Sequence, residues 1–347
     1  MNKAFLYDMI STPSVSGGEI TLQKKVAAYL REQGVTVSTD LTGDVIASIH
    51  EESPFRVLLC GHIDEIGFRV TYISEEGYLH VGKAGGVRLA LAQGKRVTVL
   101  GKKPVPGVMG LLLSKGEVKT DVEISDLYID CGFTSREDAM RLVKPGDFVT
   151  YSYTVDELEN DRIAGRGLDD KLGAYTVIHA LLRAREKGAK VGVYAATTTG
   201  EEITQRGAFH VASSVRPNLA IAVDVIHTSD YSGSLPQRFG DIKLGKGPVL
   251  CKSSVCSEAV NRALEEAAGR LDMPVQYEVA AGVMGTDADK MNQTNSGLPV
   301  TTLSIPLRYM HSPSEVGCLT DVEQCVELLA EFLCGLDENF QLDPFAI

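Results

Sequence analysis

His62 and Asp64 stand two residues apart, directly after the apolar run 57–60. In an extended chain such positions share one face, so both side chains would point the same way. A neutral imidazole is a common metal ligand, and a nearby carboxylate can fix its tautomer. The alternative is a polar cluster at a strand end that binds no ion. The pattern therefore indicates a candidate ligand, His62, with Asp64 as its supporting carboxylate.

Two adjacent acids, Asp169 and Asp170, open an apolar helix in the segment 165–173. Acids at a helix start often satisfy free N–H groups and interact favourably with the helix dipole, which is the structural alternative here. An Asp held at a helix start can also bridge two cations with its two carboxylate oxygens. Spacing alone does not decide which of the two acids would do so.

Glu201 and Glu202 follow a second apolar run, residues 190–197. Placing two carboxylates directly after a buried strand costs free energy unless a cation lies nearby. Consecutive residues leaving a strand point to opposite sides, so one Glu can bind a metal while its neighbour acts as a base. The alternative is that both side chains lie on a solvated face.

Asp224 ends the apolar run 219–223, and His311 lies in the segment 308–316, which has the composition of a turn. Each is ordinary by itself. Together, the five segments supply two His and three or four carboxylates, which is the ligand inventory of a dinuclear hydrolase site. Mixed nitrogen and oxygen donors suit Zn²⁺, Co²⁺ or Mn²⁺. The remaining histidines lack such context and are interpreted as surface or core residues: His50, His80, His179, His210 and His227.

Helix and strand patterns alternate through most of the chain, which predicts an α/β fold with a mostly parallel sheet sandwiched by helices. The run 56–60 is apolar after its first residue, as in a strand buried on both faces. The candidate side chains lie at or near the ends of such elements, where open α/β sheets place their sites. The predicted helices are 22–30, 171–187, 207–214, 254–271 and 321–336. The predicted strands are 35–38, 44–49, 56–60, 190–197, 219–225, 275–279 and 300–305.

The pattern changes between residues 68 and 154, where short alternating runs are separated by Gly and Pro. Many short strands at close spacing predict a small β-barrel or sandwich inserted into the α/β domain. The predicted domains are therefore a discontinuous α/β domain, residues 1–67 and 155–347, and an inserted β domain, residues 68–154. Within the insertion, the predicted strands are 69–73, 96–101, 107–113 and 147–153, with one helix at 135–142.

Composition narrows the classes of partner. The 347 residues include 34 basic and 46 acidic side chains, and this net charge of −12 argues against nucleic acid and anionic membrane surfaces as partners. No apolar stretch approaches the roughly 20 residues of a membrane span. The seven cysteines are odd in number and contain no CxxC, so neither a disulfide framework nor a zinc knuckle is indicated. Reduced thiols suit a cytoplasmic protein, and the N-terminus does not resemble a signal peptide.

The sequence resembles the TET-type dinuclear metallo-aminopeptidases, a family also known as glutamyl aminopeptidases or, in older naming, as endoglucanase M. The resemblance spans nearly the whole chain, including the inserted β domain. It departs from the family pattern at Thr204, where the family usually has Gly. The matching motifs occur in the family's order at residues 62–67, 167–171, 201–202, 206–208, 223–224, 285–288 and 306–313.

The resemblance implies a metal-ligand role for five of the candidates. Asp169 would bridge two divalent ions, Zn or Co, with Mn as a third option. His62 and Asp224 would complete one site, and Glu202 and His311 the other. The inserted domain is similar to the family's dimerisation domain, which would help to build a hollow tetrahedral dodecamer.

The resemblance also implies the remaining roles and the activity. Glu201 would be the general base, Asp64 would orient His62, and Asp170 is the alternative to Asp169 as the bridge. The implied function is a cytoplasmic aminopeptidase that trims short peptides. Two alternatives stay open: a dinuclear deacylase or carboxypeptidase with a similar site, and a glycoside hydrolase. A glycoside hydrolase needs two carboxyls about 5–9.5 Å apart across a sugar, and the His ligands and absent Trp speak against it.

Overall fold

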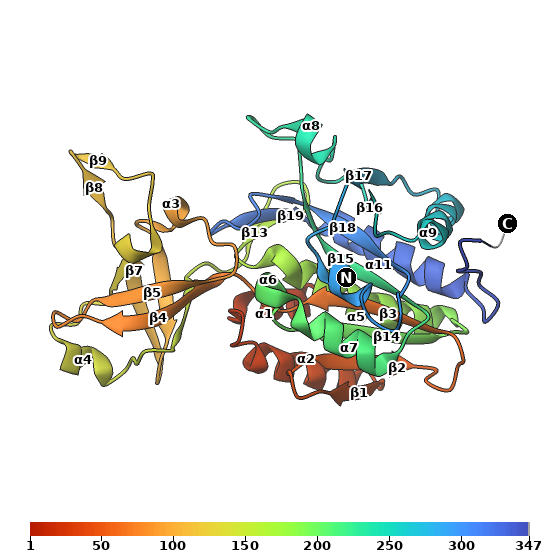
Figure 1. Cartoon of the computed structure of the whole chain (residues 1–347), viewed down its shortest axis with the longest axis horizontal. Helices are drawn as coiled ribbons and strands as arrows, with labels where there is room; N and C mark the ends of the chain where they lie inside the picture. The colour runs from red at the N-terminus through yellow and green to blue at the C-terminus, as the bar shows by residue number, and fades with distance from the viewer. Residues whose placement is uncertain (346–347) are drawn as a thin grey trace.

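A large layered domain and a smaller barrel lie side by side in Figure 1. This computed structural model describes residues 1–345. Within that range, eleven strands form one mixed sheet, in which the four central strands and one peripheral pair are parallel and the other neighbours are antiparallel. The central strands, in spatial order, are β14 (Gly192–Thr198), β3 (Arg56–His62), β15 (Leu219–His227) and β18 (Val300–Arg308). The others are β1 (Thr36–Thr39), β2 (Val45–Ile49), β12 (Asp156–Leu158), β13 (Arg162–Gly165), β16 (Val249–Ser253), β17 (Gln276–Ala280) and β19 (Glu315–Cys318).

Helices cover both faces of this sheet, because its central strands are apolar on both sides. Val57 and Leu59 of β3 pack into the larger core, whereas Leu58 and Cys60 pack into the smaller one. The helices on the larger core are α1 (Lys3–Ser11), α2 (Ile20–Glu32), α5 (Leu168–Lys187), α9 (Glu258–Arg270) and α11 (Leu319–Cys334). Those on the smaller core are α7 (Arg206–Val215) and α10 (Asp287–Met291). The predicted α/β class is confirmed.

The insertion forms a closed antiparallel barrel with its own apolar core, which confirms the predicted inserted β domain. Its strands, in spatial order, are β10 (Tyr128–Asp130), β5 (Leu79–Ala84), β4 (Gly67–Ile73), β11 (Phe148–Tyr151), β6 (Arg96–Leu100) and β7 (Pro104–Met109). Shorter elements decorate it: α3 (Leu89–Ala92), β8 (Leu113–Ser114), β9 (Glu117–Val118), a 3₁₀ turn (Ile124–Asp126) and α4 (Arg136–Met140). The β8–β9 hairpin projects from the barrel in Figure 1.

One predicted strand of the barrel is misplaced. The pattern predicts a strand at 107–113, but β7 begins at Pro104 and ends at Met109. Proline has no N–H to give to a ladder, so the sequence favours a loop around Pro104 and Pro106. Both prolines are exposed and alternate with buried residues, which lets them occupy the strand with their rings facing outward.

The carboxyl ends of β3, β14 and β15 meet at one edge of the sheet because these strands are parallel. Helix α5 passes close against β3 at this edge. A Cβ on Gly61 would lie 2.6 Å from the backbone of Gly173, so the approach requires glycine. The start of α5 and the end of β3 are thereby brought together. Within residues 1–345, no helix has the length and apolar character needed to cross a membrane.

Candidate metal centre

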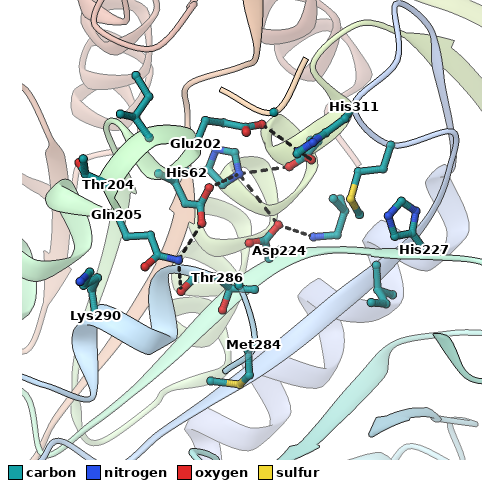
Figure 2. A pocket seen from close by; sticks show the side chains of 18 of the residues that line it. His62, Glu202, Thr204, Gln205, Asp224, His227, Met284, Thr286, Lys290 and His311 are labelled. Atoms are coloured by element: carbon teal, nitrogen blue, oxygen red, sulfur yellow. Dashed lines mark hydrogen bonds and ion pairs between the residues drawn. The ribbon is translucent and has the colours of Figure 1, made fainter. Parts of the chain in front are cut away.

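The seven candidate residues come together at this edge of the sheet. Six of them line a cavity of about 830 Å³, shown in Figure 2: His62, Asp169, Glu201, Glu202, Asp224 and His311. Asp64 lies behind the cavity and is fully buried. These residues lie at the end of β3, at the start of α5, on the short helix α6 (Glu201–Thr204), on β15 and in the turn after β18.

Asp169 lies between the two histidines. Its Oδ1 is 3.1 Å from Nε2 of His62, and its Oδ2 is 3.3 Å from Nε2 of His311. Nε2 of His62 is 4.0 Å from Oδ1 of Asp224, and Nε2 of His311 is 3.4 Å from Oε1 of Glu202. The donor atoms therefore form two neighbouring groups that share one carboxylate.

Asp170 is placed differently from its neighbour. Its Oδ2 accepts the backbone N–H of His62 at 3.1 Å, and its Oδ1 accepts that of Gly173 at 2.9 Å. The capping interpretation of the acidic pair thus describes Asp170, whereas Asp169 turns both oxygens to imidazoles. Donor atoms of His62, Asp170 and Asp224 still lie within 4.8 Å of one another, as do those of His62, Asp169 and Glu202, so both acids of the pair remain candidate ligands.

Asp64 supports His62 from behind. Nδ1 of His62 lies 3.1 Å from the backbone oxygen of Asp64 and 3.5 Å from its Oδ1. Because these atoms only accept, Nδ1 carries a ring proton, and a metal ion would bind His62 through Nε2, which faces the cavity. The same carboxylate accepts the backbone N–H groups of Glu201 at 3.0 Å and Glu202 at 3.3 Å. It therefore fixes both the imidazole and the loop that carries the two Glu.

The side chains of Glu201 and Glu202 do not lie on a solvated face, since they are only 10% and 5% exposed. Burial, together with the charges of Asp224 and Asp287, raises the pKa of Glu201 to about 9, although His62 opposes this. Burial also raises the pKa of Glu202, and its Oε1 has no hydrogen-bond partner among the described residues. A buried carboxylate oxygen that accepts no hydrogen bond is costly unless a cation lies beside it.

These observations fit a pair of divalent metal ions. Two imidazole nitrogens and several carboxylates are the donors that Zn²⁺, Co²⁺ and Mn²⁺ accept. Burial raises the pKa of Asp170 and Asp224 as well, so this cluster of acids lacks positive charge. Two divalent cations would supply that charge.

Comparison with known proteins decides the family. The family model for M42 glutamyl aminopeptidase matches residues 43–328, most of the chain. The lysyl aminopeptidase of Pyrococcus furiosus is 30% identical over 94% of this chain and 94% of its own. The chain belongs to the M42 aminopeptidase family. It is thus an aminopeptidase of a metallopeptidase family, as the resemblance implies.

Solved structures agree with this assignment. The TET aminopeptidase of the marine sediment archaeon Thaumarchaeota archaeon SCGC AB-539-E09 has a TM-score of 0.91, with 29% identity over 97% of this chain and 96% of its own. The TET1 peptidase of Pyrococcus horikoshii has a TM-score of 0.86, with 30% identity over 96% and 99%. The latter is described as assembling into a tetrahedron or a large octahedral shell. The layered domain and the barrel of this M42 aminopeptidase are therefore shared with both.

Sequence reasoning misses three residues near the metal centre. Buried Glu315 accepts the backbone N–H of Asp169 at 3.1 Å and that of His311 at 2.9 Å, so it joins the two segments. The side-chain amide of Gln205 donates to Oε1 of Glu201 at 3.2 Å. His227, interpreted above as a surface or core residue, lines the cavity in Figure 2. An acid at the start of a short, largely apolar strand is the signal that could have found Glu315.

A buried ionic network supports the metal centre of this M42 aminopeptidase. Glu65 follows Asp64 and forms an ion pair with Arg166 and another with Lys171, whose Nζ lies 2.8 Å from Oε2. All three side chains are at most 5% exposed. Arg166 and Lys171 flank Asp169 in the chain, so the network ties the start of α5 to the segment after β3. The signal in the sequence is a Lys within an apolar helix.

Proposed function

We propose that this enzyme releases N-terminal residues from short peptides through a two-metal site with Glu201 as general base. The observation that carries the proposal is the position of Asp169, with one oxygen at each histidine. Shared carboxylates of this kind hold paired metal ions in two-metal hydrolases. The proposal favours the first Asp of the pair as the bridge, since both oxygens of Asp170 already accept backbone N–H groups.

The ligand groups follow from the distances. His62 and Asp224 would hold one ion and Glu202 and His311 the other, with Asp169 common to both. When bound, the two ions supply Lewis acidity, which polarises the scissile carbonyl and lowers the pKa of the attacking water. Asp64 keeps His62 in the tautomer that leaves Nε2 able to ligate.

Glu201 performs the proton transfer in this proposal. Its Oε2 lies 3.9 Å from Nε2 of His62, and its Oε1 accepts from Gln205, so the carboxylate is aimed into the cavity and held there. It takes a proton from the attacking water and delivers it to the nitrogen of the leaving peptide. The other outcome for such a site, attack at the C-terminal residue, is tested by identifying which residue of a free peptide is released.

The cavity wall that receives the substrate side chain contains both charges and apolar groups. Met284, Thr286 and Met310 line it. Glu278 and Lys290 also line it. A panel of aminoacyl chromogenic substrates with acidic, basic and aliphatic residues measures which of these groups sets the preference.

Chelation is expected to abolish activity reversibly. Dialysis against a strong chelator should reduce hydrolysis of an aminoacyl chromogenic substrate to background, because the carboxylate cluster then lacks its cations. Adding back Zn²⁺, Co²⁺ or Mn²⁺ singly should restore it and show which ion supports the fastest turnover. Elemental analysis before and after dialysis is the control. Full activity in protein shown to be metal-free would contradict the proposal.

We further propose that the barrel, residues 68–154, mediates assembly into a tetrahedral dodecamer, and that residues 1–67 and 155–347 form the catalytic domain. The TET1 peptidase of Pyrococcus horikoshii, which is described as a tetrahedron or octahedral shell, supports this by similarity over 96% of the chain. The seven cysteines are free thiols, which supports a cytoplasmic location.

The assembly proposal predicts a large particle in solution. Light scattering coupled to gel filtration should give the mass of twelve chains, and deleting the barrel should give a smaller species or aggregated protein. The β8–β9 hairpin carries exposed Leu113 and Val118, which are 63% and 50% accessible. Changing both to Ser should reduce assembly if this hairpin is buried between subunits. A monomer at micromolar concentration would mean that the barrel only shapes access to the site.

A further inference from the structure

The segment that leaves β5 brings the barrel against the metal centre. Gly85 and Gly86 lie between β5 and α3, and Gly86 lines the cavity. A Cβ on Gly86 would lie 2.5 Å from Nδ1 and 2.7 Å from Cε1 of His311. A Cβ on Gly85 would lie 3.1 Å from Oε2 of Glu202. Two adjacent glycines of the barrel thus pack on the two residues proposed to complete one metal site.

The fold itself does not require glycine at position 86. Gly85 has a φ of +80°, which by itself favours glycine, but the φ of Gly86 lies outside this region. Gly86 is exposed to solvent, so a methyl group there would displace no core residue. The three atoms nearest to its added Cβ all belong to the imidazole of His311. The absence of a side chain at position 86 therefore leaves room for the ring of His311 in its observed position.

We propose that Gly86 is a positioning residue, whose lack of a side chain lets His311 place Nε2 between Asp169 and Glu202. The inference rests on the proposed function, in which His311 is a metal ligand. The ring is the mobile partner in this contact, since it is the far end of a side chain. A methyl at position 86 would turn it and carry Nε2 away from Oδ2 of Asp169, now at 3.3 Å, and from Oε1 of Glu202, now at 3.4 Å.

The test is the metal affinity of Gly86→Ala. Metal-free wild type and variant are titrated with Zn²⁺ by calorimetry. We expect two ions per chain for the wild type, and one unchanged site and one site weakened about 10- to 100-fold for the variant, the usual effect of disturbing the support of a metal ligand. Gly82→Ala is the matched control, because Gly82 lies in β5, is free of backbone strain, and would place its Cβ 3.3 Å from Thr71. It should bind two ions normally.

A double-mutant cycle separates positioning from general damage. If Gly86 acts through the ring of His311, adding Gly86→Ala to His311→Ala should cause no further loss of affinity. A further loss, or a metal-free melting temperature lowered in Gly86→Ala but not in Gly82→Ala, would overturn the inference. So would two unweakened sites in Gly86→Ala, while the proposed function would stand. A wild type that binds fewer than two ions would instead contradict the proposed function.

Discussion

Glu201→Gln is expected to lower kcat by about two or more orders of magnitude while both metal ions stay bound, because Gln keeps the shape of Glu but cannot accept the proton. The side-chain amide of Gln205 donates a hydrogen bond to Oε1 of Glu201, and the backbone N–H of Glu201 donates one to Asp64. Neither contact depends on the charge at Oε2, so the loop should keep its position. Single-turnover kinetics and elemental analysis on the same preparation measure the two quantities together.

Glu202→Gln is the matched control for this prediction, since it removes one carboxylate from the adjacent position. Oε1 of Glu202 faces His311 at 3.4 Å and is proposed to ligate. This variant should lose affinity at one metal site, and excess metal should partly restore its activity. Metal loss in Glu201→Gln with metal kept in Glu202→Gln would reverse the two roles. Equal and modest effects would mean that neither Glu acts in catalysis.

Glu65→Gln is expected to lower the free energy of unfolding by about 3–5 kcal/mol, because it leaves Arg166 and Lys171 buried without their counter-charge. Denaturant unfolding of metal-free protein measures the change. Asp8→Asn is the control, since it removes a charge from an exposed ion pair with Lys25 and should change stability little. A loss for Glu65→Gln as small as that of the control would show that the network contributes no stability.

The loss of stability caused by Glu65→Gln is expected to depend on pH. Burial by itself would raise the pKa of Glu65, but Arg166 and Lys171 lower it to about 2. The unfolded value is about 4.3, so the contribution is complete above that pH and is lost as the pH falls toward 2. The stability gap between wild type and Glu65→Gln should therefore narrow as the pH is lowered from 5 to 3. A gap that stays constant over this range would contradict the assigned pKa.

The apolar helices and strands of the layered domain could be predicted because buried strands are continuous apolar runs and buried helix faces are apolar stripes in the sequence. Each helix and strand predicted there lies within four residues of an observed element at both ends. Four strands were missed: β12, β13 and β19 have only three or four residues, and β16 has five. Helix α1 was missed although Leu6, Met9 and Ile10 are buried and spaced as on one helix face.

The residues of the candidate site also fall into those that a local sequence pattern predicts and those that it does not. His62, Asp224 and the acidic pairs stand at the ends of apolar runs, where their chemistry is visible in the sequence. Glu315 acts through backbone contacts to a residue 146 positions away, and no local pattern encodes that partner. Gly86 is a similar case, since its importance depends on a ring that another domain brings to it.

The insertion begins and ends at neighbouring points of the molecule. β4, its first strand, pairs with β11, its last, through Phe68 opposite Val149. His62 and Asp169 are 107 positions apart in the chain. Once the barrel has formed, its two ends lie together, so the open loop between His62 and Asp169 shrinks to about a quarter of that length. Loop-closure entropy grows with the logarithm of length, so this shortening lowers its cost by about 1 kcal/mol. A barrel that folds before the layered domain would therefore ease the approach of His62 to Asp169 without a second subunit or a metal ion.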